Sequence, residues 1–379
     1  MTAFDVAVVG MGPAGAAAAQ VLAAAGRSVV LLGKPADPRR RVGEVLTPAI
    51  GPLLVQLGIW ERFVACDPRP VHAIWSAWGG RAESEGGAGG VVSKDFVASP
   101  HGPAWRVDRL RFDELMVAAA IAAGVRTDAR FGRVAARRVG DAWRLGARGG
   151  GKALSIEARF VVDATGRTAA VARASGARWL GHDRAVAVAA LLEPKAGVEV
   201  AADDVLLVES VADGWWYSSV LPSGELVAVL VTDNDLLHAD AGPVARSWSR
   251  ALARTELTAL RAAGFRRRAV HVWPAGRGRL DRACGPGWVA VGDAASAIDP
   301  LTGAGITKAL REAAIAAKAV NEALAGDRRG VELYADRVRV AFETSFREGS
   351  DYYRQERRWP QSRFWQRRQL AEVSLRRDP

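Results

Sequence analysis

The sequence has little cysteine and no long apolar run, and each absence argues against a class of protein. Only two cysteines occur in 379 residues, Cys66 and Cys284, and neither stands at a metal-ligand spacing. We therefore expect no disulfide framework and no structural zinc site, and a reducing cytoplasm is the expected location. The start of the chain has no basic segment followed by an apolar stretch and a cleavage site. Because the apolar run from Ala14 to Ala25 is too short to span a bilayer, we expect a soluble protein without a membrane partner.

Charge of one sign is in excess. The net charge is +11, and most of the basic residues are arginine. This balance permits attraction to an anionic cofactor or an acidic protein surface. No nucleic-acid-binding module accompanies it, so nucleic acid is not an expected partner. The composition is that of a globular protein, and the length suits two closely joined domains.

The first 32 residues have the pattern of a βαβ unit. An apolar run from Phe4 to Val9 leads into glycines, then into an alanine-rich helical stretch, and then into the apolar run from Ser28 to Leu32. The glycines follow the dinucleotide-binding pattern GxGxxG, in which the first makes the turn, the second admits a pyrophosphate and the third lets the helix pack closely. The helix N-terminus would stabilise the phosphates. The predicted cofactor residues in this turn are Gly10, Gly12, Pro13, Ala14 and Gly15.

The carboxylate that usually binds the ribose after the second strand is missing. Gly33 stands at the expected position, and Lys34 follows it. Two alternatives remain open. Either backbone groups hold the ribose, or Lys34 and the arginines from Arg39 to Arg41 reach a phosphate. Lys34 and Arg41 are therefore candidate cofactor residues.

Two further motifs distinguish an FAD site from an NAD site. Asp163 to Gly166 (DATG) ends one apolar run, and Gly292 to Ala295 (GDAA) ends another. Asp293 can accept hydrogen bonds from sugar or ribitol hydroxyls, and the glycines after it would let backbone amides face a flavin at a helix start. Each aspartate alone could instead be a turn residue or a helix cap. The candidate cofactor residues here are Asp163, Gly292, Asp293, Pro300, Gly303, Ala304, Gly305 and Ile306.

The order of these motifs resembles a known FAD fold. The GxGPAG turn, Arg109 within WRVDRLRFD, then DATG and GDAA…DPL…GxG resemble the glutathione-reductase-type fold of aromatic hydroxylases and tryptophan halogenases. The resemblance implies an α/β chain with a Rossmann FAD-binding domain, an inserted β-sheet substrate domain and C-terminal helices. It also implies that Arg109 helps to hold the FAD, although Arg109 could instead form a surface ion pair at a helix start. We expect the FAD-binding domain to comprise 1–70, 101–183 and 276–325, the substrate domain 71–100 and 184–275, and the C-terminal helical region 326–379.

Motifs outside the cofactor site resemble those of the LodB-like flavoproteins. They are RVGE ending at Glu44, SAWG, DGWWYS, LDR and the C-terminal YYR…RWP…FW. Flavoproteins of that family mature quinone-cofactor oxidases by oxygenating a tryptophan of a partner protein. The resemblance therefore implies an FAD-dependent monooxygenase that hydroxylates an indole, such as a tryptophan side chain in a partner protein or peptide, through a flavin C4a-hydroperoxide. The alternatives are an oxygenase for a small aromatic substrate and a reductase of the geranylgeranyl-reductase type.

Three departures argue against halogenation. Halogenases use a lysine beside the substrate, and residues 51–90 contain none. Their WxWxIP signature is replaced here by WWYSSVLP from Trp215 to Pro222. Thr302 stands where halogenases place a glutamate. We therefore expect oxygen transfer.

The candidate catalytic residues are each open to a structural alternative. By family placement, Glu44 lies near the flavin or substrate and could be a general acid or base, or it could initiate a helix. His72 could transfer protons or be a structural histidine. Aromatic residues of the substrate wall would come from two segments, but strand alternation turns Trp216 away from its neighbours, so one side should be core. The predicted catalytic residues are Glu44, His72, Trp216 and Thr302, with no metal ligand.

The electron donor and the role of the basic C-terminal segment remain open. The sequence has no second GxGxxG unit, so electrons would come from transient NAD(P)H binding or from a separate flavin reductase. The basic, aromatic stretch from Tyr352 to Arg377 either packs over the FAD domain with solvated arginines or docks an acidic partner.

Overall fold

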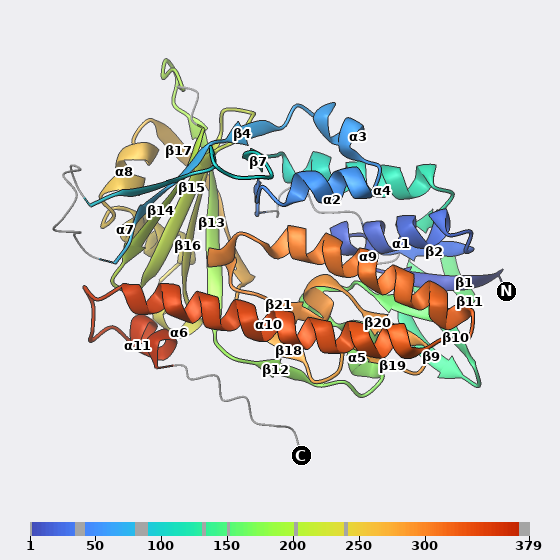
Figure 1. Ribbon diagram of the computed structural model, residues 1–379. Helices are drawn as coiled ribbons and strands as arrows, with labels where there is room; N and C mark the ends of the chain where they lie inside the picture. The colour runs from blue at the N-terminus through green and yellow to red at the C-terminus, as the bar shows by residue number, and fades with distance from the viewer. Residues whose placement is uncertain are drawn as a thin grey trace.

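A mostly parallel sheet forms from the apolar runs that end in glycine turns. The computed structural model describes residues 2–34, 42–79, 90–130, 134–149, 152–200, 204–238 and 242–370, and Figure 1 shows their arrangement. The candidate Arg41 lies outside the described residues. Five strands run parallel in the order β8-β2-β1-β11-β20, while β19, β10 and β9 pair antiparallel. The strands are β1 (Thr2–Val9), β2 (Val29–Leu32), β8 (Arg126–Asp128), β9 (Ala135–Val139), β10 (Ala142–Gly149), β11 (Lys152–Asp163), β19 (Cys284–Gly285) and β20 (Trp288–Ala290).

Small residues allow helices to pack closely against this sheet and each other. Helix α1 (Pro13–Ala24) joins β1 to β2 and buries four consecutive alanines, from Ala16 to Ala19. It packs against α4 (Arg109–Ala122) and α9 (Gly305–Leu324). Asp108 caps α4 by accepting hydrogen bonds from the amides of Leu110 and Arg111. The shorter helices in this half are α2 (Ile50–Gln56), α3 (Trp60–Val64) and α5 (Ala170–Ala174).

A seven-stranded sheet, in the order β17-β13-β16-β15-β14-β5-β6, forms the other half of the molecule (Figure 1). It is antiparallel except where β14 runs parallel to β5. Its strands are β5 (Ala73–Ala77), β6 (Val92–Asp95), β13 (Ala185–Pro194), β14 (Val205–Val211), β15 (Gly214–Val220), β16 (Leu226–Asp233) and β17 (Phe265–Pro274). All these strands come from 71–100 and 184–275, the ranges expected for the substrate domain; the domain boundaries themselves stay a prediction.

Each face of the seven-stranded sheet supports its own core. The inner face carries Trp215 and Tyr217, and it packs against Val42, Leu301 and the C-terminal helices. The outer face carries Trp216 and is covered by α7 (Val244–Leu252) and α8 (Leu257–Ala262), with α6 (Asn234–Leu237) following β16. Every residue of β16 is buried, so the side chains on its two faces contribute to the two cores.

Short elements complete the described chain. A three-stranded sheet contains β3 (Val45–Leu46), β7 (Ala104–Arg106) and β4 (Arg69–Val71), and a second contains β12 (Trp179–Gly181), β18 (Gly278–Leu280) and β21 (Ser296–Ala297). Single 3₁₀ turns occur at η1 (Gly166–Thr168), η2 (Gly292–Ala294) and η3 (Pro300–Thr302).

The two C-terminal helices connect the halves. Helix α10 (Arg329–Gln355) runs alongside both, and α11 (Arg363–Gln369) lies against the end that carries the seven-stranded sheet (Figure 1). The guanidinium of Arg368 is 1% exposed, 2.7 Å from Asp233 of β16 and above the ring of Phe364. Arg367 pairs with both Asp233 and Asp235. As far as residue 370, the segment therefore packs within the chain, and Arg367 and Arg368 pair with acidic residues of the same chain.

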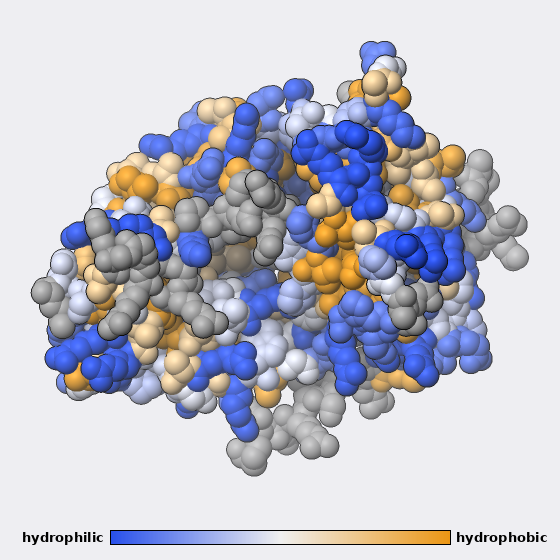
Figure 2. All heavy atoms as spheres, turned by 180° about the vertical axis from the view of Figure 1, so that it is seen from behind, coloured by the Kyte–Doolittle hydropathy of each residue, from blue (hydrophilic) through white to orange (hydrophobic). Residues whose placement is uncertain are grey.

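The helices and the surface of the described residues can be compared with what a membrane or a metal ion would require. Across the described ranges, no helix combines the length and apolar character needed to cross a membrane. Seen from behind, the surface mixes hydrophilic side chains with small apolar patches (Figure 2). The same residues contain no cluster of acidic, histidine or cysteine side chains that could hold a metal ion.

The buried pair between Arg368 and Asp233 should be a main stabilising contact of the C-terminal segment. Arg368→Met would leave the Asp233 carboxylate in the core with only Arg367 as a charged partner, at a cost of about 3 kcal/mol in the free energy of unfolding. Urea denaturation would measure the loss. The exposed Arg363→Met variant is the control and should keep the wild-type midpoint. Equal midpoints for the two variants would contradict the assignment.

Candidate functional site

The strand register brings the three sequence motifs to one edge of the parallel sheet. Val9 at the end of β1 lies opposite Leu32 of β2 and opposite Asp163 of β11, and Asp163 in turn lies opposite Ala290 of β20. The GxGxxG turn begins directly after Val9, DATG begins at Asp163, and GDAA begins two residues after Ala290. In open α/β sheets, ligands bind at the edge formed by the carboxyl ends of the strands. The three motifs lie together at that edge.

The glycines of the first turn have different reasons to be glycine. Gly10 has φ +118°, and a Cβ there would lie 2.0 Å from the carbonyl oxygen of Ala164. A Cβ on Gly15 would lie 1.9 Å from the carbonyl oxygen of Gly10. Gly12, by contrast, has no heavy atom within 4 Å of its Cβ position, and it begins α1 without a side-chain cap. The open space and the uncapped amides of α1, which begins with Pro13 and Ala14, fit a pyrophosphate.

The position of the missing ribose carboxylate is filled by the protein. A Cβ on Gly33 would lie 3.0 Å from the side chain of Met11 and 3.1 Å from its amide nitrogen. A carboxylate would therefore require the turn to move. Lys34, the neighbouring candidate, is exposed.

Asp163 is held entirely within the protein, unlike the cofactor ligand expected from the sequence. One carboxylate oxygen accepts from the amide and hydroxyl of Thr165, and the other accepts from the amides of Val171 and Ala172. The side chain is fully buried, and burial raises its pKa above the ordinary value. With four donors on two oxygens, Asp163 orders the turn and the start of α5, which is the helix-cap alternative.

Asp293 keeps a free side. Its side chain is 45% exposed and lies 3.8 Å from Arg167. The loop beneath it is fixed by Lys308 of α9, whose ammonium group donates to the carbonyl of Ser296 at 2.7 Å and pairs with Glu312 at 2.8 Å. Sequence reasoning missed Lys308 and Glu312, although their i,i+4 spacing on the α9 helix was a usable signal. Asp293 is thus available to sugar hydroxyls on a supported loop.

A second loop, Asp299 to Gly305 (the 299–305 loop), leads into α9. Asp299 caps the Pro300–Thr302 turn by accepting from the Leu301 amide at 3.0 Å. The Thr302 hydroxyl donates to the Asp299 carbonyl and accepts from the amide of Ala304, so it maintains the turn rather than standing free for catalysis. Gly305 opens α9 with no atom within 4 Å of its Cβ position, and α9, whose next residue is Ile306, has no side-chain cap. The uncapped helix start fits a group that carries negative charge.

Arg109 holds the segment that carries Glu44. Its guanidinium donates to the carbonyls of Val42 (2.6 Å) and Gly43 (3.2 Å) and lies 3.3 Å from Asp113. A Cβ on Gly43 would lie 2.8 Å from this guanidinium, so only glycine allows the approach. The Nε of Arg109 is buried without a hydrogen-bond partner. Direct contact with the FAD stays a prediction.

Glu44 is a buried carboxyl with an unused oxygen. It is 3% exposed, one oxygen accepts from the Gly43 amide at 2.9 Å, and the other has no hydrogen-bond partner. Burial raises the pKa of Glu44, and Arg109 and Arg106 only partly oppose the shift. The pKa of Tyr217 is raised well above 10, first by burial and then by the charge of Glu44. Glu44 therefore lies beside the half-buried phenol on the inner face.

The inner face presents aromatic rings to the cofactor segments. Trp78 packs edge-on to Trp215 with ring centroids 6.3 Å apart, and Tyr217 lies 6.2 Å from Trp215. Leu301 belongs to the same cluster. These three rings, Trp78, Trp215 and Tyr217, form an aromatic wall that lies against the 299–305 loop.

Two predicted catalytic residues do not meet the others. Trp216 is completely buried on the outer face, 5.2 Å from Trp248, because alternate residues of a strand point to opposite faces. Its predicted catalytic role is therefore corrected to core packing. His72 is exposed, and its backbone bonds to Asp204 and Phe96. The structure places Glu44 and the 299–305 loop that carries Thr302 next to the inner-face aromatics, but neither Trp216 nor His72.

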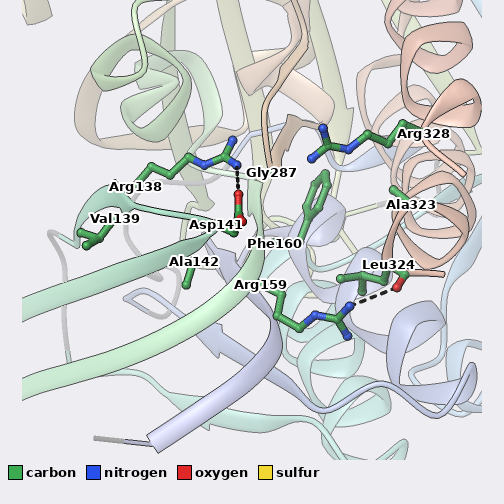
Figure 3. A pocket seen from close by; sticks show the side chains of 10 residues that line it. All are labelled: Arg138, Val139, Asp141, Ala142, Arg159, Phe160, Gly287, Ala323, Leu324 and Arg328. Atoms are coloured by element: carbon green, nitrogen blue, oxygen red, sulfur yellow. Dashed lines mark hydrogen bonds and ion pairs between the residues drawn. The ribbon is translucent and has the colours of Figure 1, made fainter. Parts of the chain in front are cut away.

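A basic hollow lies away from this site. Its volume is about 440 Å³, and Arg138, Arg159 and Arg328 surround it (Figure 3). Arg138 pairs with Asp141, and Arg159 donates to the carbonyl of Leu324. Because Arg159 precedes the Asp163 end of β11, the hollow is not at the cofactor edge.

The glycine turn, the uncapped helix starts and Asp293 define a flavin-dependent class of enzyme, and the sequence comparison agrees. Residues 3–341 match the family model described as FAD binding domain, so the chain belongs to this family. Over 375 residues it is also 26% identical to LodB of Marinomonas mediterranea, whose name describes an FAD-dependent oxidoreductase, with 97% of each chain covered. The expected resemblance to LodB-like flavoproteins is confirmed.

Solved structures share the fold. The myxobacterial chondrochloren halogenase CndH superposes with a TM-score of 0.87 at 23% identity, covering 99% of this chain and 88% of that one. The peptidyl tryptophan dihydroxylase QhpG, essential for tryptophylquinone cofactor biogenesis, gives a TM-score of 0.76 at 26% identity, covering 97% and 79%. The halogenase likeness shows the fold alone. Together these findings confirm the expected α/β FAD fold of a flavin-dependent oxidoreductase.

The different surroundings of Gly12 and Gly15 predict different outcomes for alanine substitutions. Gly12→Ala should fold with an unchanged melting temperature in the absence of FAD, because its new methyl group meets no protein atom. That methyl group would occupy the space proposed for the pyrophosphate, so FAD affinity should fall about tenfold or more. Gly15→Ala should lower the melting temperature itself, because its Cβ collides with the Gly10 carbonyl. Calorimetry and FAD titration separate the two, and wild-type FAD affinity in Gly12→Ala would contradict the placement.

The raised pKa of Glu44 predicts a pH-dependent effect on stability. A carboxyl whose folded pKa lies above its ordinary value of 4.5 contributes a stability that is lost as pH rises through the folded pKa. Glu44→Gln keeps an acceptor for the Gly43 amide but cannot ionise. The melting temperature of the variant relative to wild type should therefore increase from pH 4 to pH 8. A constant difference over this range would show that Glu44 is not shifted upward.

Proposed function

We propose that this protein is an FAD-dependent monooxygenase that hydroxylates an electron-rich aromatic ring, namely the indole of a tryptophan carried by a partner protein or peptide. The observation that carries the proposal is the juxtaposition of an aromatic wall, the 299–305 loop and a buried carboxyl with an unused oxygen. The similarity to LodB supports an FAD-dependent oxidoreductase, and the similarity to the peptidyl tryptophan dihydroxylase QhpG supports this substrate class. When bound, the flavin supplies the oxygen-activating chemistry, while the chain supplies orientation and excludes water.

The cofactor contacts in this proposal follow from the open positions. Gly12 and the first amides of α1 would hold the pyrophosphate, Asp293 the ribitol hydroxyls, and Gly305 with the amides that open α9 the flavin ring. Arg109 would act through the Val42–Gly43 segment and its unpartnered Nε. Electrons would come from NAD(P)H or from a separate flavin reductase.

Glu44 is the proposed acid–base group. Hydroxylation consumes O₂, two electrons and two protons, forms one C–O bond and releases water, and the ring carbon loses its proton. Burial raises the pKa of Glu44, and a carboxyl whose pKa is raised is a better proton donor and acceptor partner for such a step than an ordinary exposed carboxylate. One oxygen of Glu44 has no hydrogen-bond partner in the protein, so it is available for such a transfer.

The site favours oxygen transfer over halogenation. Halogenases place a lysine beside the substrate. Here Lys308 is occupied by Glu312 and two backbone carbonyls, and Lys94 lies on the exposed edge strand β6. Thr302, at the position of the halogenase glutamate, carries no charge and stabilises its own turn.

Labelled oxygen tests the proposal without knowledge of the electron donor. The FAD-loaded protein would be reduced chemically, given a tryptophan-containing peptide and mixed with isotopically labelled O₂. We expect one or more labelled oxygen atoms in the peptide by mass spectrometry, and a loss of about a hundredfold in Glu44→Gln. Trp216→Phe, on the outer face, is the matched aromatic control and should retain turnover.

Two outcomes would overturn the assignment. If the reaction forms hydrogen peroxide but no labelled oxygen enters the peptide, tryptophan or indole, aromatic hydroxylation is excluded. Hydrogen transfer to an isoprenoid alkene in place of oxygen transfer would favour the reductase alternative.

A further inference from the structure

A chain of hydrogen bonds joins the inner-face wall to the 299–305 loop. The indole N–H of Trp215 donates to the hydroxyl of Tyr353 at 3.1 Å, and that hydroxyl donates to Asp299 at 3.2 Å. Trp215 and Tyr353 are 1% exposed, and Asp299 is 4% exposed. Three elements that are distant in sequence, β15, the 299–305 loop and α10, therefore meet through one hydroxyl group.

The hydroxyl of Tyr353 is used in both directions. An indole nitrogen can only donate a hydrogen bond, and a carboxylate can only accept. The hydroxyl between them therefore accepts from Trp215 and donates to Asp299. Removal of the hydroxyl would leave the indole N–H without its acceptor in a buried cluster and would remove one donor from the carboxylate.

Asp299 determines the shape of the loop that it begins. Its side chain accepts from the Leu301 amide, and its carbonyl accepts from the amide (3.2 Å) and hydroxyl (2.8 Å) of Thr302. On the opposite side, Arg277 lies 3.8 Å from the second carboxylate oxygen and is held at 2.6 Å by Asp183. One oxygen of the Asp299 carboxylate accepts from both the Leu301 amide and the Tyr353 hydroxyl, so this oxygen links Tyr353 directly to the loop.

We propose that Tyr353 is a positioning residue that couples the 299–305 loop to the aromatic inner face. Ordering of the loop by FAD then fixes the indole of Trp215, and a ligand that fixes the wall strengthens FAD binding by the same factor, since coupling between two sites is reciprocal. The proposal goes beyond the proposed reaction. It depends on FAD binding alone, so it stands or falls separately from the hydroxylation.

The test is an FAD titration of the full chain freed of flavin, in the wild type and in Tyr353→Phe. Flavin fluorescence gives the affinity, and near-ultraviolet circular dichroism reports the buried indoles. In the wild type, FAD should change the aromatic dichroism. Tyr353→Phe should bind FAD about tenfold more weakly (about 1.4 kcal/mol) and lose that change.

Three further variants identify the origin of the effect. Trp215→Phe keeps the Tyr353–Asp299 bond, so it should lose the FAD-induced dichroism change while its FAD affinity stays within about twofold. Trp216→Phe alters the neighbouring indole on the outer face and should keep both properties. Tyr334→Phe removes another buried hydroxyl of α10, which donates to the Ala290 carbonyl at 2.8 Å, and it measures the general cost of such a loss.

The proposal is overturned by any of three results. These are wild-type FAD affinity with an intact dichroism change in Tyr353→Phe, an equal loss of both properties in Tyr334→Phe, and the absence of an FAD-induced change in the wild type. If Tyr353→Phe does not fold, the Trp215→Phe variant is the remaining test. An FAD-induced change in dichroism as large as that of the wild type in this variant would contradict the coupling.

Discussion

Backbone contact between the glycine turn and the Asp163 turn is the constraint on which the site depends. The Ala164 amide donates to the Val9 carbonyl at 2.8 Å, and the Ala164 carbonyl occupies the space that a side chain on Gly10 would need. Gly15 in turn lies against the Gly10 carbonyl. This packing directs the start of α1 outward, with Gly12 facing open space. The cofactor edge is therefore set by close approach of backbones.

Buried carboxyl groups in this protein differ in how completely their oxygens are used. Asp163 meets four donors, Asp299 meets Leu301, Tyr353 and the nearby Arg277, and Glu312 is paired with Lys308. These groups fix loops around the cofactor edge. Glu44 has one hydrogen-bonded oxygen and one without a partner, although burial of an unpaired polar atom is costly. Glu312 also has one oxygen without a hydrogen-bond partner, but its other oxygen pairs with Lys308, whereas the hydrogen-bonded oxygen of Glu44 accepts from the Gly43 backbone amide. This absence of a close cationic partner supports the proposed acid–base role of Glu44.

The shared fold does not decide between halogenation and hydroxylation. The chain superposes well on the halogenase CndH, and flavin halogenases and a tryptophan dihydroxylase occur among its structural relatives. Function resides in the side chains that a fold carries. Here the loop before α9 is stabilised by Thr302, and the wall is joined to that loop by Tyr353. The proposed reaction rests on the aromatic wall, this loop and the Glu44 carboxyl.

The sequence by itself determined the FAD fold, because strand and turn signals are local. The GxGxxG turn after an apolar run, the DATG and GDAA motifs and the family resemblance predicted an α/β fold with a Rossmann FAD-binding domain, which the structure and the family match confirm. The alternation of residues along β15 also indicated that Trp215 and Trp216 would point to opposite faces of the sheet. What it could not predict was which of the two faces would meet the cofactor segments.

Only the tertiary structure decided how individual polar groups are used. Asp163 and Asp293 look equivalent as residues at strand ends. However, Asp163 accepts hydrogen bonds from four donors, whereas the side chain of Asp293 remains partly exposed. Arg368 reads as a surface charge in a basic segment, yet it is buried against Asp233, 135 residues away in the chain. The link between Trp215, Tyr353 and Asp299 likewise joins three distant segments. Such partners depend on packing between remote elements, and no local sequence pattern contains that information.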